Sequence, residues 1–186
     1  MHTHVRGREN LGDHRNTILL SNHVSHLDPP ILYDVLRIDL KAIAKKEVFA
    51  IPFFGRVLRR AGFVSIDRRN TPQARNAVSE AAASLGKGNC FLVFPEGTRS
   101  ETGELLPFKK GAFFAAIEAG SRIVPIVIHG TQPLLPRGSW RVRAGRVSVR
   151  ILDPVHAGSY SYADRDRLVE EVRGRMATAL SELIGR

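Results

Sequence analysis

Residues 17–30 read TILLSNHVSHLDPP, and this stretch decides how the chain folds. Thr17 to Leu20 is a short apolar run with β-branched residues, which is typical of a buried strand. A helix is predicted from Asp28 to about Arg37, because aspartate is a favoured capping residue and Pro29 suits the first helical position. A polar segment thus leaves a buried strand and enters a helix, which is where open α/β sheets place their ligand sites.

The same alternation of strand and helix continues along the chain. Several of the expected strands are apolar throughout, as in a sheet that is covered on both faces. The fold class predicted is α/β, a single-domain sandwich with a mixed, largely buried β-sheet covered by helices. Further strands are expected at Leu40–Ala44, Phe63–Ile66, Phe91–Phe94, Ile123–Ile128 and Val147–Leu152, and further helices at Glu47–Ala61, Thr71 to Gly86 or Gly88, Lys109–Ala119 and Asp164–Ile184.

The length and composition favour one globular domain with a strongly basic surface. The chain has 186 residues, 43% of them hydrophobic, a formal net charge of +10 and a single cysteine. One domain over residues 1–186 is expected at this length. The charge will draw the protein to anionic partners such as phospholipid, nucleic acid or a phosphorylated substrate. Cys90 lies among apolar neighbours and is expected to be a buried strand residue in a reducing compartment.

No transmembrane helix is expected, because no stretch reaches the roughly 20 apolar residues that span a bilayer. No apolar secretory segment opens the chain either. Contact with a membrane is therefore expected to be peripheral, at its cytoplasmic face. We hypothesise that this face combines residues 47–58 with the arginines at 137, 141, 143, 146 and 150. A core helix is the competing interpretation of residues 47–58.

Residues 22–28 contain the first chemical cluster. A histidine can take a proton from a hydroxyl when an acceptor, usually a carboxylate, holds its other ring nitrogen. His23 in the loop and Asp28 at the helix start could form such a pair, although a simple loop histidine and a helix cap are the plainer alternatives. His23, His26 and Asp28 could also ligate zinc, but no fourth ligand has a clear spacing, and no metal is expected.

Three further clusters follow predicted strands. Arg68 lies near the end of the segment 62–69, where an arginine can bind phosphate oxygens in place of forming a surface ion pair. Residues 94–100 read FPEGTRS, in which Gly97 permits close backbone approach and Thr98 and Arg99 offer donors to an anion, or simply form a turn. Pro125 lies inside an apolar strand, which indicates an edge strand or a bulge and a place that could line an acyl channel.

Taken in order, these blocks resemble the glycerolipid acyltransferase family, whose best-known members are the 1-acylglycerol-3-phosphate acyltransferases. The recognisable blocks lie within residues 5–130, and residues 131–186 are expected to add a strand and a helix that complete the domain. The resemblance implies that His23 is a general base and Asp28 the carboxylate that orients it. It also implies a phosphate-holding group, which comprises Arg68, Glu96, Gly97, Thr98, Arg99 and Lys109.

The activity that the resemblance implies is acyl transfer from a thioester to 1-acylglycerol 3-phosphate, giving phosphatidic acid without an acyl-enzyme. The donor would be acyl-CoA or an acyl carrier protein, and no cofactor is expected. A phospholipid transacylase or an acyltransferase for another lyso lipid would use the same residues. A basic lipid- or nucleic-acid-binding module would explain the charge but not the His23 and Asp28 block. Few aromatic residues accompany the basic ones, so nucleic acid is not an expected partner.

Overall fold

The computed structural model describes residues 2–45, 50, 56, 60, 64–66, 71–136, 138–139 and 141–185, with backbone alone at 42–45, 64–66 and 71–75. Its helices and strands alternate as the apolar runs predict. In chain order they are β1 (His2–Arg6), η1 (Arg8–Leu11), β2 (Thr17–Ser21), α1 (Asp28–Leu36), β3 (Leu40–Lys45), β4 (Val64–Ile66), α4 (Thr71–Gly86), β5 (Cys90–Val93), α5 (Gly111–Glu118), β6 (Arg122–His129), β7 (Arg146–Ile151), β8 (Val155–His156), η2 (Ala157–Ser159) and α6 (Arg165–Ile184).

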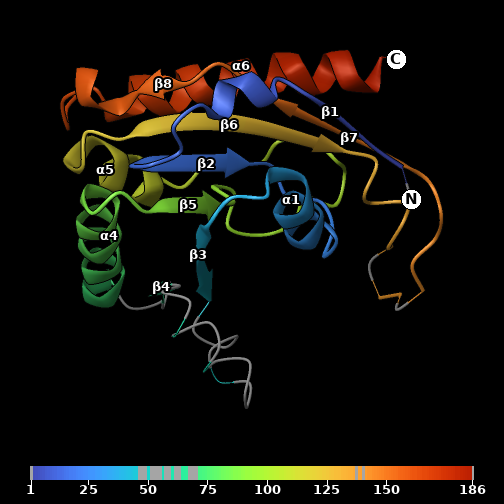
Figure 1. Cartoon of the computed structure of the whole chain (residues 1–186), viewed down its shortest axis with the longest axis horizontal. Coiled ribbons are helices and arrows are strands. Elements are labelled where there is room, and N and C mark those ends of the chain that lie inside the picture. The colour runs from blue at the N-terminus through green and yellow to red at the C-terminus, as the bar shows by residue number, and fades with distance from the viewer. Residues whose placement is uncertain are drawn as a thin grey trace.

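The strands of the described residues form one mixed sheet in the order β1-β7-β6-β2-β5-β3-β4, with β8 also paired to β6 (Figure 1). Strands β6, β2, β5, β3 and β4 run parallel to one another. Strands β7 and β8 run antiparallel to β6, and β1 is parallel to β7. The carboxyl ends of β2, β5 and β6 therefore meet at one end of the sheet, which is called the catalytic end below.

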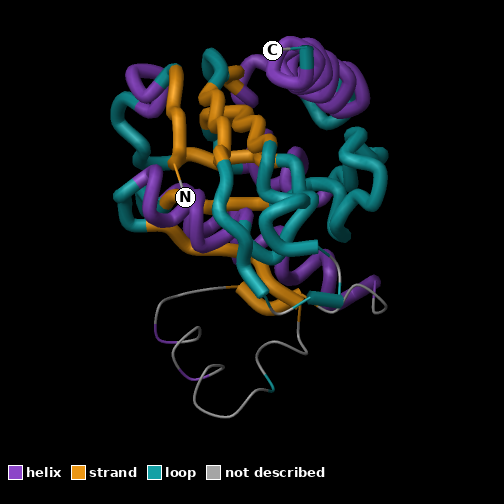
Figure 2. Tube along the Cα trace, turned by 90° about the vertical axis from the view of Figure 1, so that its right-hand side faces the viewer, coloured by secondary structure: helices purple, strands orange, loops and turns teal. Residues whose placement is uncertain are grey.

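Helices cover both faces of the sheet, and successive residues of the central strands pack against opposite layers. Ile18 and Leu20 of β2 belong to the core beneath α4, α5 and α6, whereas Leu19 belongs to the core beneath α1. Figure 2 shows the strands between these two helical layers, with α6 on one side and α1 on the other. Strands that are buried on both faces are apolar throughout, which confirms the predicted α/β sandwich with a mixed sheet.

The first strand, β1, was not predicted from the sequence. Residues 2–6 read HTHVR, with alternate side chains exposed. They become a strand because they pair in parallel with β7, from His2 opposite Arg146 to Arg6 opposite Arg150. A partner more than a hundred residues away supplies the hydrogen bonds, so the local sequence carries little sign of this strand.

The prediction that Pro125 marks an edge strand is wrong. Strand β6 is internal, with β2 on one side and β7 and β8 on the other. The carbonyl of Pro125 accepts a hydrogen bond from Leu152 N, at the break between β7 and β8. A strand residue directs its N–H and C=O toward the same neighbour, so the N–H that proline lacks would face this break. The interruption of the neighbouring strands lets a buried proline occupy a central strand.

Two predicted segments lie outside the described residues. Most of the expected helix Glu47–Ala61 falls there, and so does Arg68. The backbone of β4 (Val64–Ile66) does appear where a strand was predicted. The role proposed for Arg68 therefore stays a prediction.

Candidate active site

His23 and Asp28 form a direct pair at the catalytic end of the sheet. His23 follows β2 by two residues, and its Nδ1 lies 2.8 Å from Asp28 Oδ2. The aspartate side chain is completely buried, while the histidine side chain keeps 17% of its surface exposed. One end of the imidazole is thus held inside the protein and the ring remains accessible. This is the geometry of a histidine oriented by a carboxylate.

The Asp28 carboxylate does not cap the helix that it begins. Residue Leu27 occupies the cap position of α1 without a side-chain capping bond, and Asp28 is the first helical residue. The carboxylate turns back to the preceding loop, where Oδ2 accepts hydrogen bonds from Val24 N at 2.7 Å and Ser25 N at 2.8 Å. The capping interpretation is therefore wrong. The sharp loop brings the amides and the histidine to the same oxygen.

The second oxygen of Asp28 is held by a residue that the sequence analysis did not select. Thr131 Oγ1 donates a hydrogen bond of 2.5 Å to Asp28 Oδ1, and the threonine is completely buried. Thr131 comes from the connection that leaves β6, about a hundred residues along the chain. Both carboxylate oxygens are thereby satisfied, as a buried charge requires.

This arrangement sets the chemistry that His23 can perform. A carboxylate at Nδ1 favours the tautomer with the proton on Nδ1, which leaves Nε2 able to accept a proton. The same carboxylate stabilises the imidazolium that forms after proton transfer. The His23 ring also stacks on Phe94, with ring centroids 4.2 Å apart, so its orientation is fixed by packing as well as by hydrogen bonding.

The loop of residues 94–100 is joined to the histidine loop through backbone contacts. The His23 carbonyl accepts a hydrogen bond from Ser100 N at 2.8 Å. In return, His23 N donates to Glu96 Oε1 at 2.9 Å. The two blocks that lie some 70 residues apart in sequence therefore form one unit. Asn22 adds a third link, because its side-chain amide pairs with both backbone groups of Ile128 at the end of β6.

Glu96 has a different role from the phosphate-holding one that the resemblance implies. Its side chain is buried, and its two oxygens accept hydrogen bonds from the backbone amides of His23 and Leu106. Burial raises the pKa of Glu96, and the two amide bonds oppose that shift. A buried carboxylate with both oxygens engaged cannot bind an anion. Glu96 instead fixes the backbone that carries the histidine.

The other residues of this block remain suited to an anion. Thr98 is exposed and Arg99 is partly exposed, and neither side chain forms a hydrogen bond or ion pair with the described residues. Gly97 adopts a φ of 73°, a conformation that glycine tolerates and that turns the loop sharply. Lys109 is exposed, and its backbone N donates to Pro95 O at 2.8 Å, which keeps it beside the loop instead of in α5.

Cys90 has the structural role that its apolar neighbours predict. The side chain is buried on β5, and burial, followed by the nearby charge of Asp39, raises the pKa of its thiol to about 12. A thiol with so high a pKa is almost entirely protonated at neutral pH, so it is a poor nucleophile.

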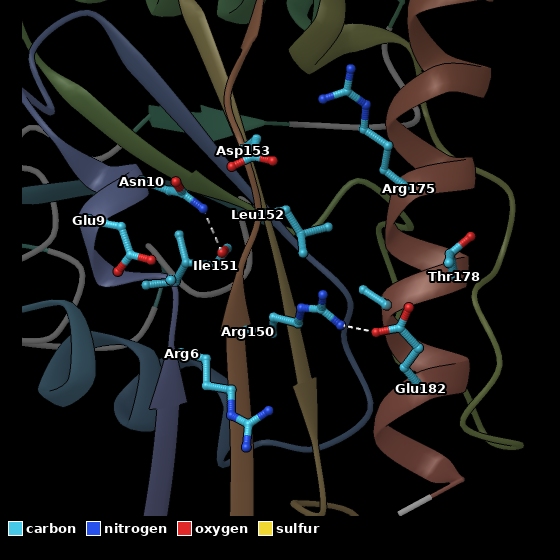
Figure 3. Close-up of a pocket in the computed structure, with 12 residues that line it drawn as sticks. Arg6, Glu9, Asn10, Arg150, Ile151, Leu152, Asp153, Arg175, Thr178 and Glu182 are labelled. Carbon is cyan, nitrogen blue, oxygen red and sulfur yellow. Dashed lines mark hydrogen bonds and ion pairs between the residues drawn. The ribbon is translucent and has the colours of Figure 1, made fainter.

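A separate polar groove of about 690 Å³ lies along the β1 edge of the sheet (Figure 3). It is bordered by the ends of β1 and β7, by η1 and by α6. Its arginines, at 6, 150 and 175, are matched by acidic residues at 9, 153 and 182, and Arg150 pairs with Glu182. Because the charges are balanced, the groove does not select an anion, and it contains none of the predicted site residues.

Among the residues that the structure describes, no helix is both long and apolar enough to cross a bilayer.

The geometry can be compared with known proteins. The Acyltransferase family model matches residues 2–129. The chain is 36% identical over 180 residues to 1-acyl-sn-glycerol-3-phosphate acyltransferase alpha of Ovis aries, covering 96% of this chain and 63% of that protein. It is 32% identical over 167 residues to 1-acyl-sn-glycerol-3-phosphate acyltransferase of Haemophilus influenzae, covering 89% and 69%. The chain thus spans somewhat under two thirds of the length of the first of these relatives.

A solved structure extends the likeness to the fold. The 1-acyl-sn-glycerophosphate (LPA) acyltransferase PlsC from Thermotoga maritima superposes with a TM-score of 0.85 at 33% sequence identity. The match covers 100% of this chain and 73% of that one. Since the family model spans most of the chain and includes both His23 and Asp28, this chain belongs to the Acyltransferase family.

Proposed function

We propose that this protein transfers a fatty acyl group from a thioester donor to the free hydroxyl of 1-acylglycerol 3-phosphate, giving phosphatidic acid. The observation that carries the proposal is the contact of 2.8 Å between His23 Nδ1 and the buried carboxylate of Asp28. The printed names of the relatives, which are 1-acyl-sn-glycerol-3-phosphate acyltransferases, support the choice of acceptor.

The reaction needs one proton carrier and no covalent enzyme intermediate. The acceptor hydroxyl gives its proton to His23 Nε2 as its oxygen attacks the thioester carbonyl carbon. The tetrahedral intermediate then collapses, the carbon–sulfur bond breaks, and the thiolate takes the proton from the imidazolium. Asp28 stabilises the imidazolium throughout, because its charge is buried and fixed by Val24 N, Ser25 N and Thr131.

The phosphate of the acceptor is proposed to bind at the exposed donors beside His23. Arg99 and Thr98 belong to the loop whose Ser100 N donates to the carbonyl of His23. Lys109 lies next to the same loop, and we expect Arg68 to join this group. An arginine binds phosphate oxygens in a forked geometry, which would orient the acceptor with its hydroxyl toward the imidazole.

The acyl donor is proposed to be acyl-CoA or an acyl carrier protein, and the reaction to occur at the cytoplasmic face of a membrane. The net charge of +10 supports peripheral attachment to an anionic membrane surface. Pro125 lies on the sheet face that packs against α4, α5 and α6, by alternation with Ile123 and Val127. A part in an acyl channel remains a proposal for this residue.

The decisive experiment measures thiol release from acyl-CoA with lysophosphatidic acid in mixed vesicles, and identifies the lipid product by mass spectrometry. His23→Ala is the test variant, and His26→Ala is the matched control, because His26 lies in the same loop and is exposed. Acceptor-dependent release that yields phosphatidic acid and is lost only in His23→Ala is the expected result.

Three other outcomes would reject the proposal. Equal activity of His23→Ala and the wild type would remove the histidine from the mechanism. Absence of phosphatidic acid with both acyl-CoA and acyl carrier protein donors, while another lyso lipid is acylated, would replace the acceptor. Acyl transfer from a phospholipid without any thioester would identify a transacylase.

A further inference from the structure

The connection from β6 to β7, residues 130–145, begins at the catalytic carboxylate. Thr131 donates to Asp28 Oδ1 at 2.5 Å, and Ser25 Oγ donates to Leu135 O at 3.5 Å. The start of the connection is therefore part of the His23 site. A membrane or a partner that contacts the rest of the connection will therefore lie close to the His23 site.

Both ends of this connection are fixed. Leu134 is buried in the core under α1, and its carbonyl accepts a hydrogen bond of 2.8 Å from Arg143 N. The last residue, Gly145, accepts a hydrogen bond of 3.1 Å from His2 N at the start of β1. The described residues between Leu134 and Arg143 thus belong to a loop that this hydrogen bond closes at the catalytic end of the sheet. Figure 1 shows this loop extending beyond the strand ends, on the side of the N-terminus.

The charged side chains in and around this connection are all positive. Residues 119–152 contain six arginines and no aspartate or glutamate. The structure separates these arginines. Arg122 donates to the carbonyls of Asp13 and Asn10, and Arg150 pairs with Glu182 in the polar groove at the β1 edge of the sheet. Arg150 therefore does not belong to the membrane face that the sequence analysis hypothesised, and Arg137 lies outside the described residues.

The remaining arginines are exposed at the catalytic end. Arg141, Arg143 and Arg146 are exposed, and none of their guanidinium groups forms an ion pair with a described residue. The acidic loop at 101–104 touches the connection at its start, where Gln132 Nε2 donates to Glu101 O. Three cations without acidic partners in the described part of the chain leave a local excess of positive charge at the tip and at the start of β7.

An exposed apolar side chain lies between two of these cations. Val142 keeps 59% of its surface exposed, and its neighbours are Arg141 and Arg143. Tyr162 and Ile184 are the other large hydrophobic side chains that the described part of the chain exposes, and both belong to the α6 region. An apolar residue flanked by arginines suits the boundary between lipid headgroups and acyl chains, where the cations contact phosphates.

We propose that Arg141, Val142, Arg143 and Arg146 form a docking surface for an anionic phospholipid bilayer. This surface would deliver the His23 site to the lipid, because the loop that carries it shares Thr131 and Leu135 with the site. The inference deepens the proposed function, and the reason for such a docking surface rests on that function. Binding to a bilayer, however, is measured without any turnover.

The test is partitioning of the whole chain onto vesicles of phosphatidylcholine with 30% phosphatidylglycerol, measured by co-sedimentation. Each cation near an anionic surface is worth about a fivefold change in partitioning, so Arg141→Ala with Arg143→Ala should reduce it roughly 30-fold. The matched control is Arg8→Ala with Lys87→Ala, which removes the same charge from exposed residues in η1 and in the turn after α4. The control should bind nearly as the wild type does.

A charge-preserving variant separates a lipid surface from a specific phosphate clamp. Arg141→Lys with Arg143→Lys keeps both charges but not the forked geometry, so it should retain wild-type partitioning.

The Arg-to-Ala variant should keep wild-type turnover with a short-chain lysophosphatidic acid that is monomeric in water. It should lose turnover only with acceptor embedded in vesicles.

Three results would overturn the inference. These are unchanged partitioning of the Arg-to-Ala variant, an equal loss in the Arg8 and Lys87 control, and a parallel loss of turnover on the monomeric acceptor. The last would make these arginines part of the substrate site. If no variant, nor the wild type, acylates lysophosphatidic acid, the proposed function fails, yet the partitioning still decides whether this surface binds lipid.

Discussion

The catalytic end of the sheet and the polar groove at its β1 edge use the same kinds of charged residue in opposite ways. At the catalytic end, Asp28 and Glu96 are buried and every carboxylate oxygen accepts a hydrogen bond. In the polar groove and on α6, the pairs of Arg150 with Glu182 and of Arg175 with Glu171 are partly exposed to solvent. Buried charges that are fully hydrogen-bonded fix the surrounding atoms in one arrangement. Exposed ion pairs are screened by water and constrain the structure only weakly.

This contrast indicates where mutations will matter. Removing one partner from a buried network leaves a charge or a polar group without compensation, which is costly. Removing one partner from an exposed pair returns the other to water. Substitutions of similar size should therefore have large effects at the catalytic end and small ones at the polar groove.

The largest effect is expected for His23→Ala. Loss of a positioned general base should lower kcat by about 100- to 10,000-fold, while the KM for the acceptor changes little because the phosphate contacts remain. Steady-state kinetics with acyl-CoA and lysophosphatidic acid measures both constants. Arg175→Ala, in the polar groove, serves as the control and should leave kcat unchanged. A rise in KM with an unchanged kcat would contradict the assignment of His23 as the base.

Thr131→Val tests the buried network itself. The substitution keeps the shape of the side chain but removes the donor to Asp28 Oδ1, so the free energy of unfolding should fall by about 2 kcal/mol. The value of kcat should fall as well, because the carboxylate loses one of its fixed contacts. Thr131→Ser should restore both quantities. Urea unfolding and kinetics measure them, and a Val variant with full activity would show that Thr131 does not position Asp28.

Arg99→Ala should act on acceptor binding. Loss of one charge-assisted contact to phosphate should raise the KM for lysophosphatidic acid about tenfold and leave kcat largely unchanged. Arg68→Ala is expected to behave in the same way. Arg15→Ala, which breaks an exposed pair with Asp13, is the control. If kcat and KM changed equally, Arg99 would be acting in the chemical step.

Glu96 provides a prediction for the pH dependence of stability. Because burial raises its pKa, the folded protein holds this proton at pH values where the unfolded chain has lost it. The stability that follows is fully present below the unfolded value of about 4.3 and is lost as pH rises through the folded value. Relative to Glu96→Gln, the wild type should lose stability over this range. Urea midpoints of both proteins at several pH values test this, and a wild type that gains stability relative to Glu96→Gln as the pH rises would contradict it.

The smallest effect is expected at the polar groove. Arg150 and Glu182 form an ion pair with side chains about one third and one half exposed. A double-mutant cycle with Arg150→Ala and Glu182→Ala should give a coupling below about 1 kcal/mol. A coupling of several kcal/mol would remove the contrast between the catalytic end and the polar groove.

Most of the central architecture could be predicted because its signals are local. Apolar runs mark β2, β5 and β6, and prolines and glycines mark where α1 and α4 begin or end. The strand of residues 2–6 and the internal position of Pro125 could not be predicted. Both depend on strand pairing, which joins residues far apart in sequence.

The candidate site divides in the same way. His23 and Asp28 were found together because they lie five residues apart, on either side of a strand end and a helix start. Thr131 and the positioning role of Glu96 were missed, since each depends on a contact with a distant loop. One signal was present for Thr131, a small hydroxyl residue two places after a buried strand, but many such residues occur in turns.

The sequence by itself determined which residues could carry the chemistry and roughly where each strand and helix lies, because side-chain type and hydrophobic period act over a few residues. Only the tertiary structure decided how those residues are used. In the folded protein the Asp28 carboxylate contacts His23 instead of capping the helix, and Glu96 accepts hydrogen bonds from two backbone amides. Arg150 lies apart from the arginines of the exposed loop. Each outcome depends on burial and on partners that are brought together only when the sheet assembles, and no local pattern encodes such neighbours.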